Sequence, residues 1–299
     1  MLTKNVYDIP YPETTPVDMD EVKNFFDETL LPFFAEKLGL VIRTDLAVMG
    51  PEYATNSYIC FLAPSAESDP YLAIYNVNNS GEIGRYSYAI TPVKKVENYF
   101  RPWTIQTGGI VNDLRTVTRS GSTILLQGRE LTTYKGYLVM IDFHDGRKVA
   151  CFRSVRISDG IFVYQGGTSS IYFGPIKMNG NIVNTCVVLA AGFNSAWLTD
   201  YEQCACSTEI TNIPIIYRGV YTQNSGLIYS SDIGKEFLIS LDFCIGEDAY
   251  LPNCFWYSDC VSLSNLSVGT VLTINNKKYV CISYPNAIYT KLLIPEEVN

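Results

Sequence analysis

The stretch Tyr137-Leu-Val-Met-Ile-Asp-Phe-His-Asp-Gly-Arg-Lys-Val-Ala-Cys-Phe152 is the clearest indication of fold class in this chain of 299 residues. Two runs of residues that favour strands flank the dipeptide Asp145-Gly146. Asp and Gly tolerate the positive φ angles of a tight turn, so the stretch predicts a β-hairpin. Asn275-Asn276 lies between two similar runs and predicts a second hairpin near the C-terminus.

Short runs of Val, Ile, Tyr, Phe and Thr, separated by turn residues, continue along the chain from residue 40. No helical pattern alternates with them, so a parallel α/β sheet is not expected. The turn at residues 158–160 is expected to add a third strand to the first hairpin. The fold is predicted to be mainly β, with antiparallel sandwich- or barrel-type sheets and one N-terminal amphipathic helix. The expected strands are residues 40–48, 57–63, 71–77, 85–91, 114–119, 123–127, 136–143, 147–157, 161–164, 182–190, 213–221, 236–244, 270–274, 278–283 and 290–294.

The predicted helix begins after Asp18, a candidate N-cap, and ends at Gly39. Pro32 lies inside the pattern and is expected to kink or divide the helix near Leu30. Apolar residues recur at steps of three and four, which gives the helix one apolar face. We expect this face to pack on a sheet of the same chain; docking on another subunit is the alternative. The face consists of Val22, Phe25, Phe26, Leu30, Phe33, Phe34 and Leu38.

Three segments are expected along the chain. Residues 1–17 carry Pro10, Pro12 and Pro16 and predict an extended N-terminal arm, either disordered or laid on a neighbour. Residues 18–134 are interpreted as a helix-plus-β domain, and residues 135–299 as a mainly antiparallel β domain. The boundary is placed in the polar zone around residues 128–135.

Composition argues against several classes of function. The net charge is −8, so neither nucleic acid nor a membrane surface is an expected partner. His144 is the single histidine, which argues against His-dependent catalysis. The nine cysteines are an odd number and mostly lie in apolar runs, and no signal peptide is visible at the N-terminus. We therefore expect the chain to fold in a reducing cytosol.

Charged residues are almost absent between Asp159 and Asp200, where Lys177 is the only one. Such a segment is either covered on both faces within its own domain or covered by another subunit. Depletion of charge together with aromatic residues is typical of an interface core, so the segment is a candidate interface. The candidate interface residues are Ile161, Phe162, Tyr164, Ile171, Tyr172, Phe173, Phe193 and Trp197.

Three groups of residues carry possible chemistry, each with an ordinary alternative. Cys204, Cys206, Cys254 and Cys260 have a spacing unlike that of usual zinc sites. Neighbouring acids near tryptophans suggest a glycan site, but solvated loops are the expected interpretation. His144 is expected to be exposed at a hairpin tip. No catalytic, cofactor or metal residue is predicted. The acids and tryptophans are Asp200, Glu202, Glu247, Asp248, Trp197 and Trp256.

The proline-bearing arm, single helix and many short strands resemble structural proteins of tailed-bacteriophage virions. The runs Gly269-Thr-Val-Leu-Thr-Ile-Asn-Asn-Lys-Lys-Tyr-Val-Cys-Ile282 and Tyr289-Thr-Lys-Leu-Leu-Ile-Pro295 are similar to the closing hairpins of neck, tail and baseplate components. This resemblance implies a non-enzymatic homo-oligomer, made in the bacterial host cytoplasm and assembled in the virion with copies of itself and other structural proteins. A carbohydrate-binding or glycan-depolymerising β module is the alternative, and a zinc-bound adaptor is a third hypothesis.

Overall fold

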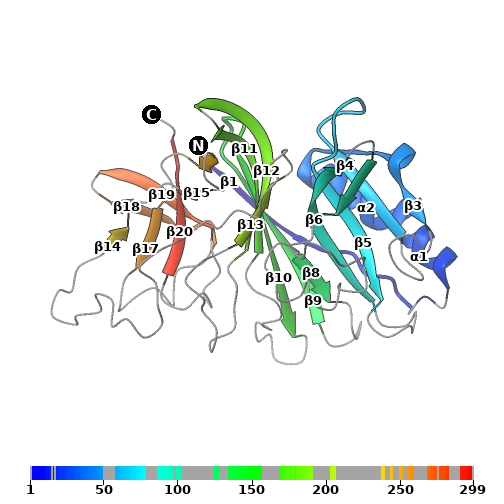
Figure 1. Ribbon diagram of the computed structural model, residues 1–299. Coiled ribbons are helices and arrows are strands. Elements are labelled where there is room, and N and C mark those ends of the chain that lie inside the picture. Colours follow the sequence, from blue (N-terminus) through cyan, green and yellow to red (C-terminus); the bar gives the residue numbers. More distant parts are fainter. Residues whose placement is uncertain are drawn as a thin grey trace.

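The computed structural model describes residues 2–14, 16, 18–49, 58–78, 86–96, 99–102, 124–127, 134–156, 169–178, 180–190, 203–206, 237–239, 243–244, 249–251, 255–258, 268–274, 276–282 and 290–297. These residues form three antiparallel sheets and a helical region near the N-terminus (Figure 1). The predicted fold class, mainly β with antiparallel sheets and one N-terminal helix, is confirmed. Within these ranges, no helix combines the length and apolar character needed to cross a membrane.

The helical region runs from Met19 to Leu38 in three parts: α1 (Met19–Phe25), a π-helical turn (Phe26–Leu30) and α2 (Leu31–Leu38). Asp18 is the N-cap, since its side chain accepts a hydrogen bond of 2.9 Å from the Glu21 amide. Gly39 ends α2 with φ 69°. Pro32 stands in the first turn of α2, directly after the π turn, where the regular α-helical hydrogen-bond pattern is already interrupted. The π turn immediately before it divides the helix at the predicted place.

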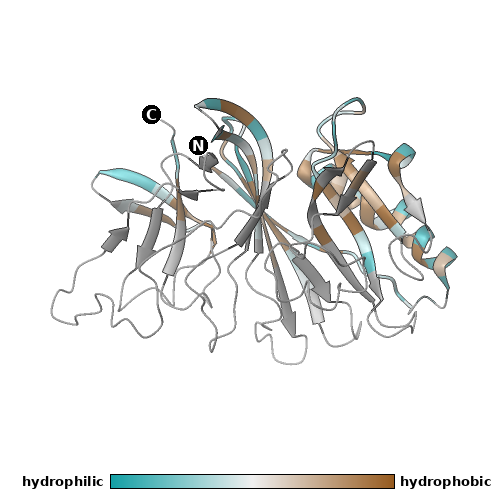
Figure 2. Ribbon diagram, in the orientation of Figure 1, coloured by the Kyte–Doolittle hydropathy of each residue, from teal (hydrophilic) through white to brown (hydrophobic). Residues whose placement is uncertain are grey.

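The apolar face of the helix packs on sheets of the same chain, as expected. Val22, Phe26, Leu30, Phe34 and Leu38 are all buried. They lie against apolar residues of β4 and β5, and Figure 2 shows hydrophobic residues concentrated where the helices meet these strands. Phe25 and Phe33 are partly buried at the rim of the same cluster.

The first sheet has seven strands and lies beside the helix. Its order is β2-β4-β5-β6-β7, with β3 paired to β4 and β8 paired to β6. The expected strand at 40–48 is instead β2 and β3 on either side of a 3-10 turn, Thr44–Leu46. The turn is held by Arg43, whose guanidinium donates to Asp45 and to the Ser68 carbonyl. The expected strand at 114–119 lies outside the described residues. The strands are β2 (Val41–Ile42), β3 (Val48–Met49), β4 (Tyr58–Ala63), β5 (Leu72–Asn78), β6 (Tyr86–Val96), β7 (Tyr99–Pro102) and β8 (Ile124–Gln127).

The middle sheet has eight strands in the order β1-β9-β10-β11-β12-β13, with β16 paired to β11 and β15 paired to β16. The hairpin predicted at Asp145-Gly146 is confirmed as β9–β10, and its loop has positive φ at His144 (58°) and Gly146 (94°). The third described strand of this meander is β11, whereas the expected strands 161–164 and 213–221 lie outside the described residues. The strands are β1 (Thr3–Asp8), β9 (Tyr134–Asp142), β10 (Lys148–Arg156), β11 (Ser169–Met178), β12 (Asn181–Ala190), β13 (Gln203–Cys206), β15 (Phe243–Cys244) and β16 (Ala249–Leu251).

Strand β11 changes partner along its length. Its first half pairs with β10, ending at Phe173, and its last residues pair with β16, beginning at Lys177. Between them lie Gly174, with φ 144°, and Pro175, which has no N–H to donate. The switch therefore falls where the ladder is already interrupted, and β11 and β12 form the curved arch of Figure 1.

The C-terminal sheet has five strands in the order β14-β17-β20-β19-β18. The second predicted hairpin is confirmed as β18–β19, in which Ile274 pairs with Lys277 and Asn276 has φ 64°. The prediction of a single strand at 236–244 is wrong. Residues 237–239 form β14 in this sheet, and residues 243–244 form β15 in the middle sheet. The strands are β14 (Phe237–Ile239), β17 (Phe255–Ser258), β18 (Val271–Ile274), β19 (Lys277–Cys281) and β20 (Thr290–Pro295).

One hydrophobic cluster extends across the boundary proposed at residues 134–135. It joins Ile9 of the N-terminal segment, Phe34 of the helix, Leu138 and Phe152 of the middle sheet, and Leu62 of the first sheet. Strand β1 of the N-terminal segment is extended and pairs with β9 of the same chain. The arm, the helix and two sheets therefore share a core.

Candidate functional site

Three of the candidate interface residues in the uncharged segment are described, and the chain itself covers all three. Ile171, Tyr172 and Phe173 are 0%, 1% and 7% exposed. They belong to β11, an interior strand with neighbours on both sides. This corrects the expectation of a subunit contact at these three residues, because the alternative, burial within the chain, accounts for them. The remaining candidates, Ile161, Phe162, Tyr164, Phe193 and Trp197, lie outside the described residues.

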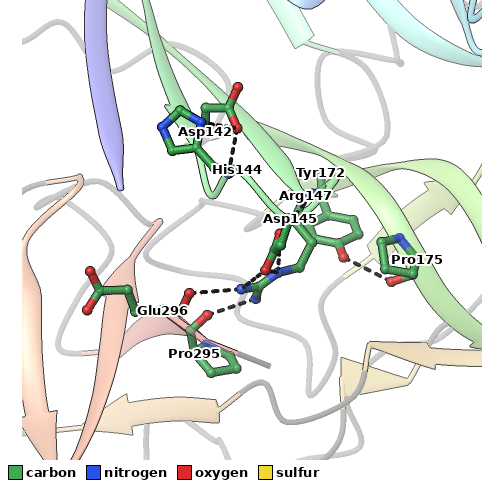
Figure 3. Close-up of polar contacts among 8 residues, drawn as sticks. All are labelled: Asp142, His144, Asp145, Arg147, Tyr172, Pro175, Pro295 and Glu296. Atoms are coloured by element: carbon green, nitrogen blue, oxygen red, sulfur yellow. Dashed lines mark hydrogen bonds and ion pairs between the residues drawn. The ribbon is translucent and has the colours of Figure 1, made fainter. Parts of the chain in front are cut away.

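Arg147 makes several polar contacts at the junction of the middle and C-terminal sheets (Figure 3). Its side chain is buried, yet its guanidinium donates to the carbonyl oxygens of Pro295 at 2.8 Å and Glu296 at 3.0 Å. Its Nε donates to both carboxylate oxygens of Asp145 at 3.0 and 2.8 Å. The central carbon of the Arg147 guanidinium lies 4.4 Å from the centre of the Phe143 ring. All the described contacts place this cation where it ties the β9–β10 turn to the end of β20.

Asp145 balances the buried charge of Arg147. Burial raises the pKa of the Asp145 carboxyl, but the Arg147 side chain and amide both donate to it, and together they lower this pKa by more than burial raises it. The net pKa is below its ordinary value, so Asp145 is ionised at neutral pH. The pair is a charge-assisted contact that stabilises the turn.

Two further polar contacts cross the same junction. Lys4 Nζ, in β1, donates to the Val268 carbonyl at 2.7 Å. Ser170 Oγ, in β11, donates to the Ile282 carbonyl at 2.9 Å and lies 3.2 Å from Cys151 Sγ. Each acceptor is a backbone carbonyl next to a strand of the C-terminal sheet. The two sheets are thus joined through the backbone, which makes the junction insensitive to the side chains at the acceptor positions.

Thr3, His144 and Asp142 form a chain of polar groups that superficially resembles a hydrolase triad. Thr3 Oγ1 lies 2.7 Å from His144 Nε2, but Asp142 Oδ1 is 3.8 Å from His144 Nδ1, beyond hydrogen-bonding distance. The same Asp142 oxygen accepts the His144 backbone amide at 2.8 Å. Asp142 therefore shapes the loop and does not orient the imidazole as a triad carboxylate does. His144 is exposed, as predicted; sequence reasoning missed its contact with Thr3 because the two are far apart in the chain.

The other candidate chemistry falls mainly outside the described residues. Cys204 and Cys206 both belong to β13, and Trp256 belongs to β17. Cys254, Cys260, Asp200, Glu202, Glu247, Asp248 and Trp197 are not described. Among the described residues, no group of three or more His, Cys, Asp or Glu side chains is placed to hold a metal ion. Cys60 and Cys151 are buried free thiols, and burial raises the pKa of each to about 12.

Exposed large hydrophobic side chains in the described ranges lie on strands with an open edge. Val6 (54% exposed) is on β1, Val41 (41%) on β2 and Val271 (42%) on β18; each strand ends the order of its sheet. Ile182, the most exposed at 75%, is on β12, whose pairing with β13 covers only Val187–Ala190. Open edges offer backbone donors and acceptors to another chain, and an apolar side chain adds area to bury. Sequence reasoning missed these positions because strand order decides which strands are edges.

Within the described residues, apolar side chains are thus exposed on strands of all three sheets. A comparison with models of protein families finds none that matches this chain, and a search of curated proteins finds no match either.

Proposed function

We infer that the protein is a structural component of a tailed-phage virion, in the neck, tail or baseplate, which assembles with copies of itself and other virion proteins through its sheet edges. The observation that carries this inference is the edge exposure of Val6, Val41, Ile182 and Val271 across all three sheets. Covering apolar area stabilises such a contact by about 25 cal/mol per Å². The resemblance of the arm, helix and closing hairpins to virion components supports the same function.

Side-chain contacts join the helix to the middle sheet and the middle sheet to the C-terminal sheet within one chain. Phe34 of the helix lies 6.1 Å from the Phe152 ring of the middle sheet, measured between ring centres. Arg147, Lys4 and Ser170 then join the middle sheet to the C-terminal sheet. An assembly made of such units has edges held at fixed relative positions, which favours a defined arrangement of neighbours.

Multi-angle light scattering tests the assembly function, together with mass spectrometry of proteins in purified phage particles from cells that make the protein. We expect the wild type to elute above the 33.5 kDa chain mass and to be present in particles. Ile182→Lys and Val271→Lys should lower the oligomer mass, since charged edge residues oppose strand addition. Ala66→Lys, at an exposed loop position, controls for the added positive charge. A wild type that stays monomeric at its highest soluble concentration and is absent from particles contradicts the proposal.

A further inference from the structure

The N-terminal strand β1 binds to a surface formed by distant parts of the chain, which we call the seat. The seat consists of β9 together with His144, Val268 and Lys37. The backbone of β1 pairs with β9, from Thr3 opposite Asp142 to Asp8 opposite Tyr137. Three side-chain contacts flank this ladder, each to a different element. They are Thr3 Oγ1 with His144 Nε2 at 2.7 Å, Lys4 Nζ with the Val268 carbonyl at 2.7 Å, and Lys37 Nζ over the Tyr7 ring at 4.8 Å.

Two glycines shape this seat for arm side chains. A Cβ atom on Gly136 would lie 2.5 Å from the Tyr11 hydroxyl, and one on Gly269 would lie 2.6 Å from Lys4 Cδ. Both distances are inside van der Waals contact, so the Tyr11 or Lys4 side chain would have to shift to make room for a Cβ atom. The seat is therefore complementary to the arm in shape as well as in hydrogen bonding.

The contacts in the seat do not depend on which chain supplies the arm. Most of β1 is exposed: only Thr3 and Tyr7 are even half-buried. The strand is held by its ladder and the contacts just described, together with Ile9, which is buried in the core. The connection between Tyr11 and the helix carries Pro12 and Pro16, which favour an extended chain. An extended connection lets the arm reach outward as well as back.

We propose that this seat binds the N-terminal segment of a second copy, so that neighbouring subunits are joined by exchanged β1 strands. The proposal rests on the assembly function proposed above and names one of its contacts. Exchange re-forms the same β1–β9 ladder, the same contacts with His144, Val268 and Lys37, and the same fit against Gly136 and Gly269. Because the contacts are equal, the local concentration of neighbours in an assembly decides between the two arrangements. No chemical bond is made or broken.

Cysteine cross-linking in the full chain tests this proposal. Asp8 is exposed and lies directly opposite the half-buried Tyr137 in the β1–β9 ladder. Asp8→Cys and Tyr137→Cys are placed on two differently tagged chains, co-expressed and oxidised mildly. We expect a covalent product of twice the 33.5 kDa chain mass that contains both tags, at least tenfold above the control. The control pairs Asp8→Cys with Lys148→Cys, on β10, which does not face β1. The wild type, oxidised in parallel, gives the background from native cysteines.

The double variant Asp8→Cys/Tyr137→Cys on one chain makes every outcome decisive. If it cross-links only within monomers, and the two-chain experiment gives no more product than its control, the exchange proposal is wrong. If it forms no cross-link at all, the β1–β9 ladder is not formed in solution and the proposal is equally wrong. The assembly function fails separately: oligomers that are present in particles but have their arms bound within each chain would refute exchange alone.

Discussion

The guanidinium of Arg147 donates a 2.8 Å hydrogen bond to the carbonyl of Pro295, a residue 148 positions later in the chain. This bond connects the turn of the first hairpin to the last strand. Arg147 is 3% exposed, so its charge is compensated inside the protein by Asp145 and by backbone carbonyls. Removal of the side chain leaves those carbonyls without their donor.

Arg147→Ala is therefore expected to lower the free energy of unfolding by about 2–4 kcal/mol, because buried acceptors lose a charged donor. Urea denaturation followed by circular dichroism measures this change. Lys278→Ala is the matched control, since it removes only a 3.8 Å ion pair to Glu296 from a side chain that is 65% exposed. An Arg147→Ala effect no larger than that of the control would contradict the role of Arg147.

Acid should weaken the same junction through Asp145. Its folded pKa is below its ordinary value, so its contribution to stability is present above the ordinary value and is lost as the pH falls through the folded pKa. The difference in unfolding free energy between wild type and Asp145→Asn should be constant from about pH 7 to pH 5 and should shrink below about pH 4. Urea titrations at these pH values measure it. A difference that persists unchanged at about pH 3 would contradict the assignment.

The fit of the arm against Gly136 predicts a non-additive pair of substitutions. Gly136→Ala is expected to cost about 1–3 kcal/mol, since a methyl group collides with the Tyr11 hydroxyl. Tyr11→Phe removes that oxygen, so the double variant should be more stable than the sum of the two single changes implies. Thermal and urea denaturation of the four proteins give the coupling energy. Strict additivity would show that the two residues are not in contact.

The helix should depend much more on Phe34 than on its neighbour Phe33. Phe34 is fully buried and lies against Phe152, whereas Phe33 is only partly buried. Phe34→Ala is expected to cost about 3–5 kcal/mol because it leaves a cavity between the helix and the middle sheet. Phe33→Ala, measured in the same urea titration, should cost clearly less. Equal losses would indicate that the helix does not present this face to the core.

Buried thiols should resist alkylation in the folded protein. Burial raises the pKa of Cys60 and Cys151 to about 12, so few thiolates form near neutral pH and reagent has little access. Peptide mapping after iodoacetamide treatment should find these two cysteines unmodified in native protein and modified once urea has unfolded the chain. Modification of either residue at the same rate in both states would contradict its burial.

Local signals were sufficient for several elements. Asp18 caps the helix, Gly39 ends it, Pro32 follows the π turn, and Asp145-Gly146 turns the first hairpin. In each case the physical cause lies within a few residues of its effect. The apolar face of the helix could also be assigned correctly, since its spacing of three and four residues is set by the helix itself.

Pairing between strands that are far apart in the chain could not be predicted from local sequence in the same way. β1 mixes Thr3, Val6 and Tyr7, which favour strands, with Lys4, Asn5 and Asp8, which do not, so its pairing with β9 decides its structure. β11 contains Gly174 and Pro175, which argue locally against a continuous strand, yet β12 pairs with it along its whole length. The uncharged segment allowed two interpretations, and only strand order shows that Ile171 and Tyr172 are covered by their own chain.

Composition and local spacing were therefore enough to establish a mainly β chain with one N-terminal amphipathic helix and two hairpins, because turn and cap preferences act over short distances. The three-dimensional arrangement was needed to show which strands lie at edges, why Arg147 is buried, and that the arm fits against Gly136 and Gly269. Those features arise from contacts between residues far apart in the chain, whose energies depend on the packing of the whole molecule.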